Sequence, residues 1–216
     1  MNILIVDDHP LTVSVYSGII GEKFSNTPNI LSAYNCEEGH IAVSQSAKTA
    51  APIDIAIVDY NLPPYENENI FNGADLAVYL KKLYKDCKVL MITSHTEILI
   101  IYDLLRRVNP HGLVSKNDVD ANNLIDIIIQ VIDGRLYKSP QIKKCINEVW
   151  SNDIMVDEYN RKILLYLAKG YKIKELEDVV MLSKSAIQKR ILKLRRAFNA
   201  KDERGLMKKI FQEKFL

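Results

Sequence analysis

Short runs of β-branched residues and leucine alternate with segments of helical periodicity five times over the first 132 residues. Each apolar run has four to six residues, which is the usual length of a strand that is buried on both faces. The alternation is typical of a parallel sheet with helices on both faces. The predicted strands are Asn2–Val6, Ile30–Ala33, Ile53–Val58, Lys88–Ile92 and Gly112–Ser115. The predicted helices between and after them are Leu11–Phe24, Glu37–Ser46, Ala74–Tyr84, Glu97–Arg107 and Asn122–Ile132.

The last third of the chain has only the helical pattern. Gly170 follows the first of its apolar stripes as a helix-ending glycine, and Ser183 precedes the third as a capping residue. The predicted helices are Glu158–Lys169, Lys172–Val180, Lys184–Phe198 and Glu203–Phe215. We therefore predict an α/β doubly wound, parallel five-stranded domain over residues 1–135, a linker over 136–153, and a small all-α domain over 154–216.

Charge is distributed unevenly between these two parts. Residues 1–154 carry 13 basic and 19 acidic side chains, a net charge of −6, whereas residues 155–216 carry 16 and 8, a net charge of +8. A basic domain attached to an acidic body suggests a module that binds a polyanion, although a solvated basic face has the same composition. Three cysteines without C-x-x-C spacing, together with the lack of a signal-peptide or membrane-spanning pattern, lead us to expect a cytoplasmic protein with no membrane contact.

Acidic and polar side chains stand where the predicted strands end. Asp7 and Asp8 follow the first strand, Asp59 follows the third, and Thr93 and Lys116 follow the fourth and fifth. Since the carboxyl ends of parallel strands share one edge, these side chains are expected to converge. Three carboxylates need a counter-charge, which a hard cation such as Mg²⁺ supplies. With a lysine and a hydroxyl, the cluster indicates phosphoryl transfer onto a carboxylate. The alternative is that the acids are helix caps or solvated loop residues.

Four motifs occur in order along these strand ends: V-D-D-H-P at 6–10, D-x-x-L-P at 59–63, T-S at 93–94, and lysine at 116. Together they resemble the flavodoxin-like receiver domain of two-component response regulators, over about residues 1–135. The resemblance implies that a sensor histidine kinase phosphorylates Asp59. It also implies that Asp8, Asp59 and the backbone carbonyl of Asn61 ligate Mg²⁺ directly, with Asp7 acting through water. Thr93 and Lys116 would contact the phosphoryl oxygens.

Two features depart from the receiver pattern, and His9 within the first motif is weighed separately. Leu113 stands where receivers usually carry an aromatic residue, so we expect the signal to pass by backbone and helix shifts. The loop at 63–73 is longer than is typical and is a lid, a partner surface or simple padding. His9 lies next to Asp8, but no second histidine follows at metal-ligand spacing, so we interpret it as a polar loop residue.

The segment Lys184–Phe198 combines one apolar stripe with basic side chains on its remaining faces. Such a helix suits the major groove of DNA, because the apolar stripe packs on its own domain while the cations meet phosphates. The order of residues from Leu167 to Phe198 resembles a LuxR-type helix-turn-helix output domain, with Glu177 where a small residue is usual. We predict that Ser185, Gln188 and Lys189 reach base edges. The residues predicted to meet phosphates are Lys184, Arg190, Lys193 and Arg196.

The combined prediction is a transcription regulator, not an enzyme, that is switched by phosphorylation of Asp59 and binds double-stranded DNA as a homodimer. Three alternatives remain open. In the first, the receiver is degenerate and DNA binding does not depend on phosphate. In the second, the helical domain is an adaptor that binds protein. In the third, the acids belong to a phosphatase with an aspartyl nucleophile. The phosphatase pattern places a D-x-D motif on the first strand, whereas Asp7 and Asp8 are adjacent.

Overall fold

The computed structural model describes residues 1–24, 27–49, 51–150, 157–213 and 215–216. It contains two compact units: Met1–His95 with Asp103–Lys143, and Thr96–Tyr102 with Lys144–Leu216. The end of the predicted linker and the predicted start of the helical domain at residue 154 fall outside the described residues. Among the helices that are described, none is both long and apolar enough to cross a membrane.

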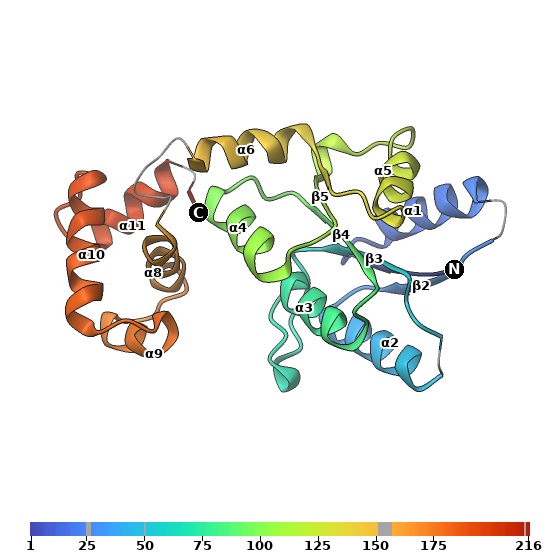
Figure 1. Ribbon diagram of the computed structural model, residues 1–216, viewed down its shortest axis with the longest axis horizontal. Helices are drawn as coiled ribbons and strands as arrows, with labels where there is room; N and C mark the ends of the chain where they lie inside the picture. The colour runs from blue at the N-terminus through green and yellow to red at the C-terminus, as the bar shows by residue number, and fades with distance from the viewer. Residues whose placement is uncertain (25–26, 50, 151–156, 214) are drawn as a thin grey trace. The chain divides into compact units, whose positions relative to one another are not determined.

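The first unit is built on a parallel sheet with the strand order β2-β1-β3-β4-β5-β6 (Figure 1). The strands are β1 (Asn2–Val6), β2 (Asn29–Ala33), β3 (Ile55–Asp59), β4 (Lys88–Thr93), β5 (Gly112–Ser115) and β6 (Tyr137–Lys138). The predicted doubly wound fold is confirmed, but the predicted number of five strands is wrong. The sixth strand has two residues, which is too short to produce a recognisable apolar run, and it lies within the segment predicted to be the linker.

Helices cover both faces of the sheet (Figure 1). Helices α1 (Pro10–Lys23) and α5 (Leu124–Ile132) lie together on one face, while α2 (Cys36–Lys48) and α3 (Gly73–Leu83) lie together on the other. Asn35 and Asn72 begin α2 and α3, because their side chains accept hydrogen bonds from backbone N–H groups of the first helical turn. The core under α1 and α5 contains Ile3, Ile5, Val13, Ile20, Ile55, Ile57, Leu90, Ile92, Val114, Leu124, Ile127, Ile128 and Val131.

The segment that follows β4 differs from its prediction as one helix over Glu97–Arg107. It forms a short α-helix, α4 (Ile98–Asp103), and then a π-helical stretch over Leu104–Val108. Asn109 ends this stretch in the left-handed conformation, with φ at 47°. Apolar periodicity does not distinguish the α-helix from the π-helix here, because a single turn with i→i+5 hydrogen bonds shifts the positions of the apolar residues only slightly.

The loop at 63–73 is an ordered hairpin beside α3 (Figure 1). Tyr65 and Ile70 exchange backbone hydrogen bonds of 2.7 and 3.2 Å, and a 3₁₀ turn at Glu66–Glu68 connects them. Ile70 is buried, whereas Phe71 is exposed. The tilted ring pair of Tyr65 and His40, with centroids 5.5 Å apart, attaches the hairpin to α2.

The second unit is helical, as predicted. Its helices are α6 (Pro140–Trp150), α8 (Glu158–Ala168), α9 (Leu176–Val180), α10 (Lys184–Ala197) and α11 (Glu203–Gln212), and a 3₁₀ turn at Ile173–Glu175 precedes α9. Helix α6 begins inside the segment predicted to be the linker, and its first residues belong to the first unit. Gly170 has a φ of 89° after α8, and Ser183 caps α10 by accepting from the N–H of Ala186. The buried core contains Ile98, Leu99, Ile163, Leu164, Leu176, Val180, Ile187, Ile191, Leu194, Phe198, Leu206, Ile210 and Phe215.

Met181, which ends α9, allows a test of backbone strain in this unit. Its φ is 59°, a conformation that costs a residue with a Cβ about 1–2 kcal/mol, and its side chain is 81% exposed. Glycine relieves that cost but loses more entropy on folding, so we expect Met181→Gly to raise the free energy of unfolding by about 0.5–1 kcal/mol. Gly170→Ala is the matched control, because it introduces the same strain into open space and should lower that free energy. Denaturant unfolding of both variants measures the two signs, and a loss of stability in Met181→Gly would contradict the argument.

Candidate functional site

The acidic residues predicted to converge do so at the carboxyl edge of the sheet. Lys116 lies between two of them, with Nζ at 2.8 Å from Asp7 Oδ2 and 3.0 Å from Asp59 Oδ2. Asp7 and Asp59 are only 4% and 5% exposed, whereas Asp8 is accessible at the rim. Two carboxylates therefore contact one ammonium group, and Asp8 lies nearby at the rim, which leaves an excess of negative charge at the site.

Burial and charge shift the ionisation of the central pair. Burial raises the pKa of Asp59 above its usual value, and the nearby charge of Asp7 adds to that, while Lys116 acts in the opposite direction. Burial acts to lower the pKa of Lys116, but its hydrogen bonds and charge interactions with Asp7 and Asp59 outweigh burial, and the pKa is raised. Lys116 is therefore a fixed cation at neutral pH.

The backbone around Asp59 holds its carboxylate in one orientation. Asp59 Oδ1 accepts a hydrogen bond of 2.8 Å from the N–H of Tyr60, so Oδ1 and the Lys116-bound Oδ2 are both oriented. Gly73 packs against the same residue, and a Cβ there would lie 1.7 Å from the Asp59 carbonyl oxygen. The first residue of α3 must therefore be glycine for the helix to start this close to the acid.

Thr93 and Asn61 flank the acids. Thr93 ends β4, next to the residue that pairs with Asp59, and its fully buried Oγ1 accepts a hydrogen bond of 3.1 Å from the N–H of His95. His95 Nε2 lies 2.9 Å from Asn61 Oδ1, and its ring packs edge-on against Tyr60 with centroids 4.9 Å apart. His95 thus connects the loops after β3 and β4, a role that its isolated position in the sequence does not suggest.

The donor set fits a divalent cation. One ligand atom from each of Asp7, Asp8, Asp59 and His9 lies within 4.8 Å of the other three. Three of these donors are carboxylates, the hard oxygen ligands that Mg²⁺ prefers, and Lys116 alone does not balance their charge. His9 is the unexpected member, because its Nδ1 lies 2.7 Å from Asp8 Oδ1 and 3.0 Å from Asp7 Oδ1. His9 was interpreted from the sequence as a polar loop residue rather than a metal ligand, and its contacts with both acids were not foreseen.

Tyr16 on α1 also belongs to the surroundings of this site and was missed by the sequence argument. Burial raises the pKa of its hydroxyl, and the charges of Lys116, Asp7 and Asp59 all act on it. An aromatic residue in the middle of a helix is usually a core residue, so its spacing gave no sign of this position.

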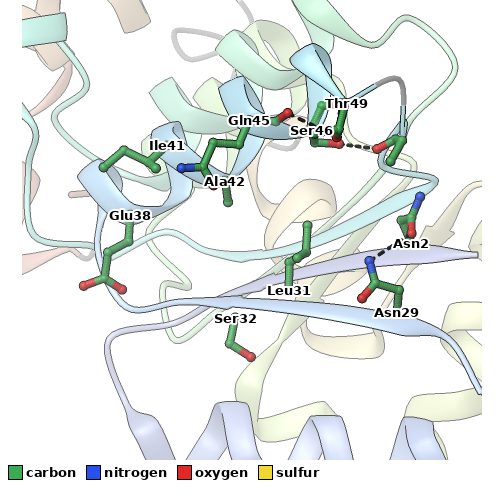
Figure 2. A pocket seen from close by; sticks show the side chains of 11 residues that line it. Asn2, Asn29, Leu31, Ser32, Glu38, Ile41, Ala42, Gln45, Ser46 and Thr49 are labelled. Atoms are coloured by element: carbon green, nitrogen blue, oxygen red, sulfur yellow. Dashed lines mark hydrogen bonds between the residues drawn. The ribbon is translucent and has the colours of Figure 1, made fainter.

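A separate pocket of about 460 Å³ lies between β2 and α2 (Figure 2). Glu38 is the one charged residue among its described lining residues. Both oxygens of Glu38 are already used, since they accept from the N–H of Tyr34 and from the side chain of Asn35. This pocket therefore offers no reactive group, and the acidic cluster remains the candidate site.

The second unit presents a basic surface along α10. Six of the seven residues predicted to contact DNA are exposed: Lys184, Ser185, Gln188, Lys189, Lys193 and Arg196. The apolar stripe of Ile187, Ile191 and Leu194 is buried in the core of the unit. The helix thus has the division into a packed face and a basic solvent face that its sequence indicates.

Arg190, the seventh predicted DNA contact, occupies a different environment. Its Nη1 atom lies 2.6 Å from Asp157 Oδ2 and 3.1 Å from Asn160 Oδ1, so Arg190 connects α10 to the start of α8. Burial acts to raise the pKa of Asp157, but the hydrogen bond from Arg190 and those from the start of α8 lower it below its usual value. The structure does not support the prediction that Arg190 meets phosphate, because its guanidinium group is already engaged within the unit.

Glu177 also has a local partner that its sequence position does not reveal. Its Oε1 accepts a hydrogen bond of 2.7 Å from the N–H of Lys184, the first residue of α10. A carboxylate at a helix N-terminus is stabilised by the free N–H groups and the helix dipole. This contact explains why a charged residue is tolerated where the two helices approach each other.

Substituting Arg190 distinguishes a structural role from DNA contact. We expect Arg190→Met to lower the free energy of unfolding by about 1 kcal/mol, a modest value because the pair is partly exposed. The salt dependence of DNA binding should be unchanged in that variant. Lys193→Met is the matched control and should do the reverse, with unchanged stability and a salt slope reduced by about 1. A salt slope reduced as much in Arg190→Met as in Lys193→Met would show that Arg190 meets phosphate after all.

Comparison with known proteins agrees with this arrangement. Residues 3–129, more than half of the chain, match the family model for the response regulator receiver domain. The chain belongs to the response regulator receiver family, and the acidic edge of its sheet is the site that defines this class. The oxygen regulatory protein NreC of Staphylococcus carnosus is 22% identical over 228 residues, covering 100% of this chain and 99% of that protein.

Solved structures extend the fold match across both units. A structure of two RcsB dimers bound to two parallel DNAs matches with a TM-score of 0.63 at 15% identity, covering 98% of each chain. RcsB from Salmonella enterica serovar Typhimurium, bound to promoter rprA in the presence of the phosphomimetic BeF₃⁻, matches with a TM-score of 0.60 at 15% identity, covering 98% of each chain. The chain thus has a receiver domain followed by a helical domain, with the fold of those two-domain structures.

Proposed function

We propose that this protein is a transcription regulator whose DNA binding is switched by phosphorylation of Asp59. The observation that supports the proposal most directly is the position of Lys116, which bridges Asp59 and Asp7 at 3.0 and 2.8 Å. A lysine in that position neutralises oxygens of a phosphoryl group on Asp59 without leaving the site. The donor would be the phosphohistidine of a sensor histidine kinase, as the receiver family implies.

In the proposed reaction, one carboxylate oxygen of Asp59 bonds to phosphorus while the phosphorus–nitrogen bond to the kinase histidine breaks. The electron pair stays on the imidazole. Asp7, Asp8, Asp59 and the backbone carbonyl of Asn61 would hold Mg²⁺, which supplies positive charge at the phosphoryl oxygens. Thr93 would donate its hydroxyl hydrogen to one of those oxygens while its Oγ1 still accepts from the N–H of His95.

Helix α10 is the proposed DNA-recognition helix. Ser185, Gln188 and Lys189 lie in its first two turns, exposed, where side chains can reach base edges in the major groove. Lys184, Lys193 and Arg196 would bind phosphates. A structure of RcsB contains two dimers bound to two parallel DNAs, which supports a homodimer here as well. A two-fold dimer would place two copies of α10 about one DNA turn apart.

Phosphorylation would add about −1.5 to −2 charges at a site that is already acidic. Because Leu113 is buried and is not aromatic, the proposed signal travels through the loops after β3 and β4 rather than through an aromatic side chain. The connection of Thr93, His95, Asn61 and Tyr60 supplies a physical route for that movement.

A DNA-selection experiment tests the switch. The full chain is incubated with and without beryllofluoride and Mg²⁺, random duplex fragments are selected on each form, and oligomeric state is measured in parallel. The proposal expects tighter binding of one shared sequence and a larger dimer fraction with beryllofluoride. Equal affinity and mass in both forms would favour a receiver that phosphate does not control. Failure to bind any duplex at low salt would favour a protein-binding adaptor.

A further inference from the structure

The side chain of His9 lies at the acidic site, but it is not among the metal ligands that the receiver resemblance implies. Its Nδ1 lies 2.7 Å from Asp8 Oδ1 and 3.0 Å from Asp7 Oδ1. The ligand atoms of these three residues and of Asp59 all lie within 4.8 Å of one another. A nitrogen donor is therefore placed among three carboxylates, and not merely beside one of them.

Local structure fixes the imidazole in this position. His9 is the residue before α1, with an extended backbone, and Pro10 begins the helix. The backbone N–H of His9 donates to Asp7 Oδ1 over 2.9 Å, so the main chain itself is held against the acid. The side chain is 66% exposed, which leaves room for an ion to enter from solvent.

The distances suit one shared ion. Two ligands at right angles around an ion that is about 2.0–2.1 Å from each are about 3.0 Å apart. His9 Nδ1 makes direct hydrogen-bond or ion-pair contacts of 3.0 Å with Asp7 Oδ1 and 2.7 Å with Asp8 Oδ1. These separations are close to that value, so a shared ion would replace the direct contacts without moving the three side chains far. Lys116 binds Oδ2 of Asp7 and Asp59, so it does not compete for Oδ1 of Asp7.

We propose that His9 is a nitrogen ligand of the divalent metal ion at this site, and that it makes the site favour Mn²⁺ over Mg²⁺ more strongly than carboxylates alone would. The inference rests on the proposed metal site. Imidazole suits transition-metal ions, whereas Mg²⁺ prefers oxygen donors, and so one histidine in the ligand set shifts selectivity toward the transition metal. The site would bind either ion. His9 would be a ligand of Mn²⁺ but not of Mg²⁺.

Pulsed electron paramagnetic resonance of the full chain loaded with Mn²⁺ tests the ligation. A directly bound imidazole adds a ¹⁴N modulation to the electron spin echo, and labelling with ¹⁵N-histidine changes its pattern. We expect this signal in the unmodified protein and its loss in His9→Gln, which retains an oxygen donor. His95→Gln is the matched control for the other nearby imidazole and should keep the signal. Calorimetric titration should show the Mn²⁺-to-Mg²⁺ affinity ratio falling at least about tenfold in His9→Gln.

The outcomes separate this inference from the function on which it rests. Mn²⁺ that binds without nitrogen modulation, or a signal that survives in His9→Gln, overturns the role of His9 and leaves the acidic metal site standing. If neither ion binds the unmodified protein, the proposed metal site fails and the inference fails with it. Loss of Mn²⁺ binding in Asp59→Asn would support the proposed metal site. Loss of the nitrogen signal in His9→Gln, with Mn²⁺ still bound, would support the role of His9.

Discussion

Asp59→Asn is expected to take up no phosphoryl group from acetyl phosphate and Mg²⁺, while the unmodified chain takes up one. The amide is not a nucleophile of comparable strength, and no other acid in the cluster has the same position relative to Lys116 and the N–H of Tyr60. Lys116 keeps its 2.8 Å contact with Asp7 in the variant, so the fold should persist. Intact-mass spectrometry of the chain before and after incubation measures the uptake.

Asp86→Asn is the matched control for this prediction, because Asp86 is an exposed acid away from the cluster. It should be phosphorylated as fully as the unmodified chain. Phosphorylation of Asp59→Asn to the same extent would mean that another residue is the acceptor, and the assignment of the site would be wrong. Asp8→Asn should keep the acceptor but weaken the binding of Mg²⁺, so that a higher Mg²⁺ concentration is needed for phosphorylation, since Asp8 is a proposed metal ligand.

Replacing Lys184, Lys193 and Arg196 together by glutamine is expected to weaken DNA binding on the order of 100-fold at physiological salt. Each cation that leaves a phosphate lets counterions return to the DNA, which lowers the slope of log affinity against log salt by about 0.9. Three such losses reduce the slope by about 3. All three side chains are exposed on α10, so the core of the unit is not disturbed.

The control is an equal change of charge on the first unit. Lys48, Lys82 and Lys85 are exposed on or beside α2 and α3, and their replacement by glutamine should leave the slope nearly unchanged. Filter binding or fluorescence anisotropy across a salt series measures both variants. Equal loss in the two variants would indicate that net charge rather than α10 controls binding.

The acidic site could be predicted because it depends on topology. Asp7 and Asp59 are 52 residues apart, yet alternating strands and helices imply a parallel sheet, whose strand ends meet at one edge. The buried apolar stripe of α10 could also be predicted, because it depends on a repeat within one helix. Both features follow from patterns that local sequence carries.

The contacts that escaped prediction depend on how elements pack against each other. Arg190 looks like any other cation on a basic helix, and only the approach of α8 gives it Asp157 and Asn160 as partners. Glu177 acquires its role from the turn between α9 and α10, and His9 from the orientation of its own backbone toward Asp7. The strand β6 was missed for another reason, since two residues do not form a pattern.

Locating the phosphoryl group within the unmodified chain tests the central assignment most directly. After incubation with acetyl phosphate and Mg²⁺, peptide mapping by tandem mass spectrometry should find the modification on Asp59, in the peptide that continues through Tyr60 and Asn61. A phosphoryl group on Asp7, on Asp8 or on any residue other than Asp59 would contradict the account.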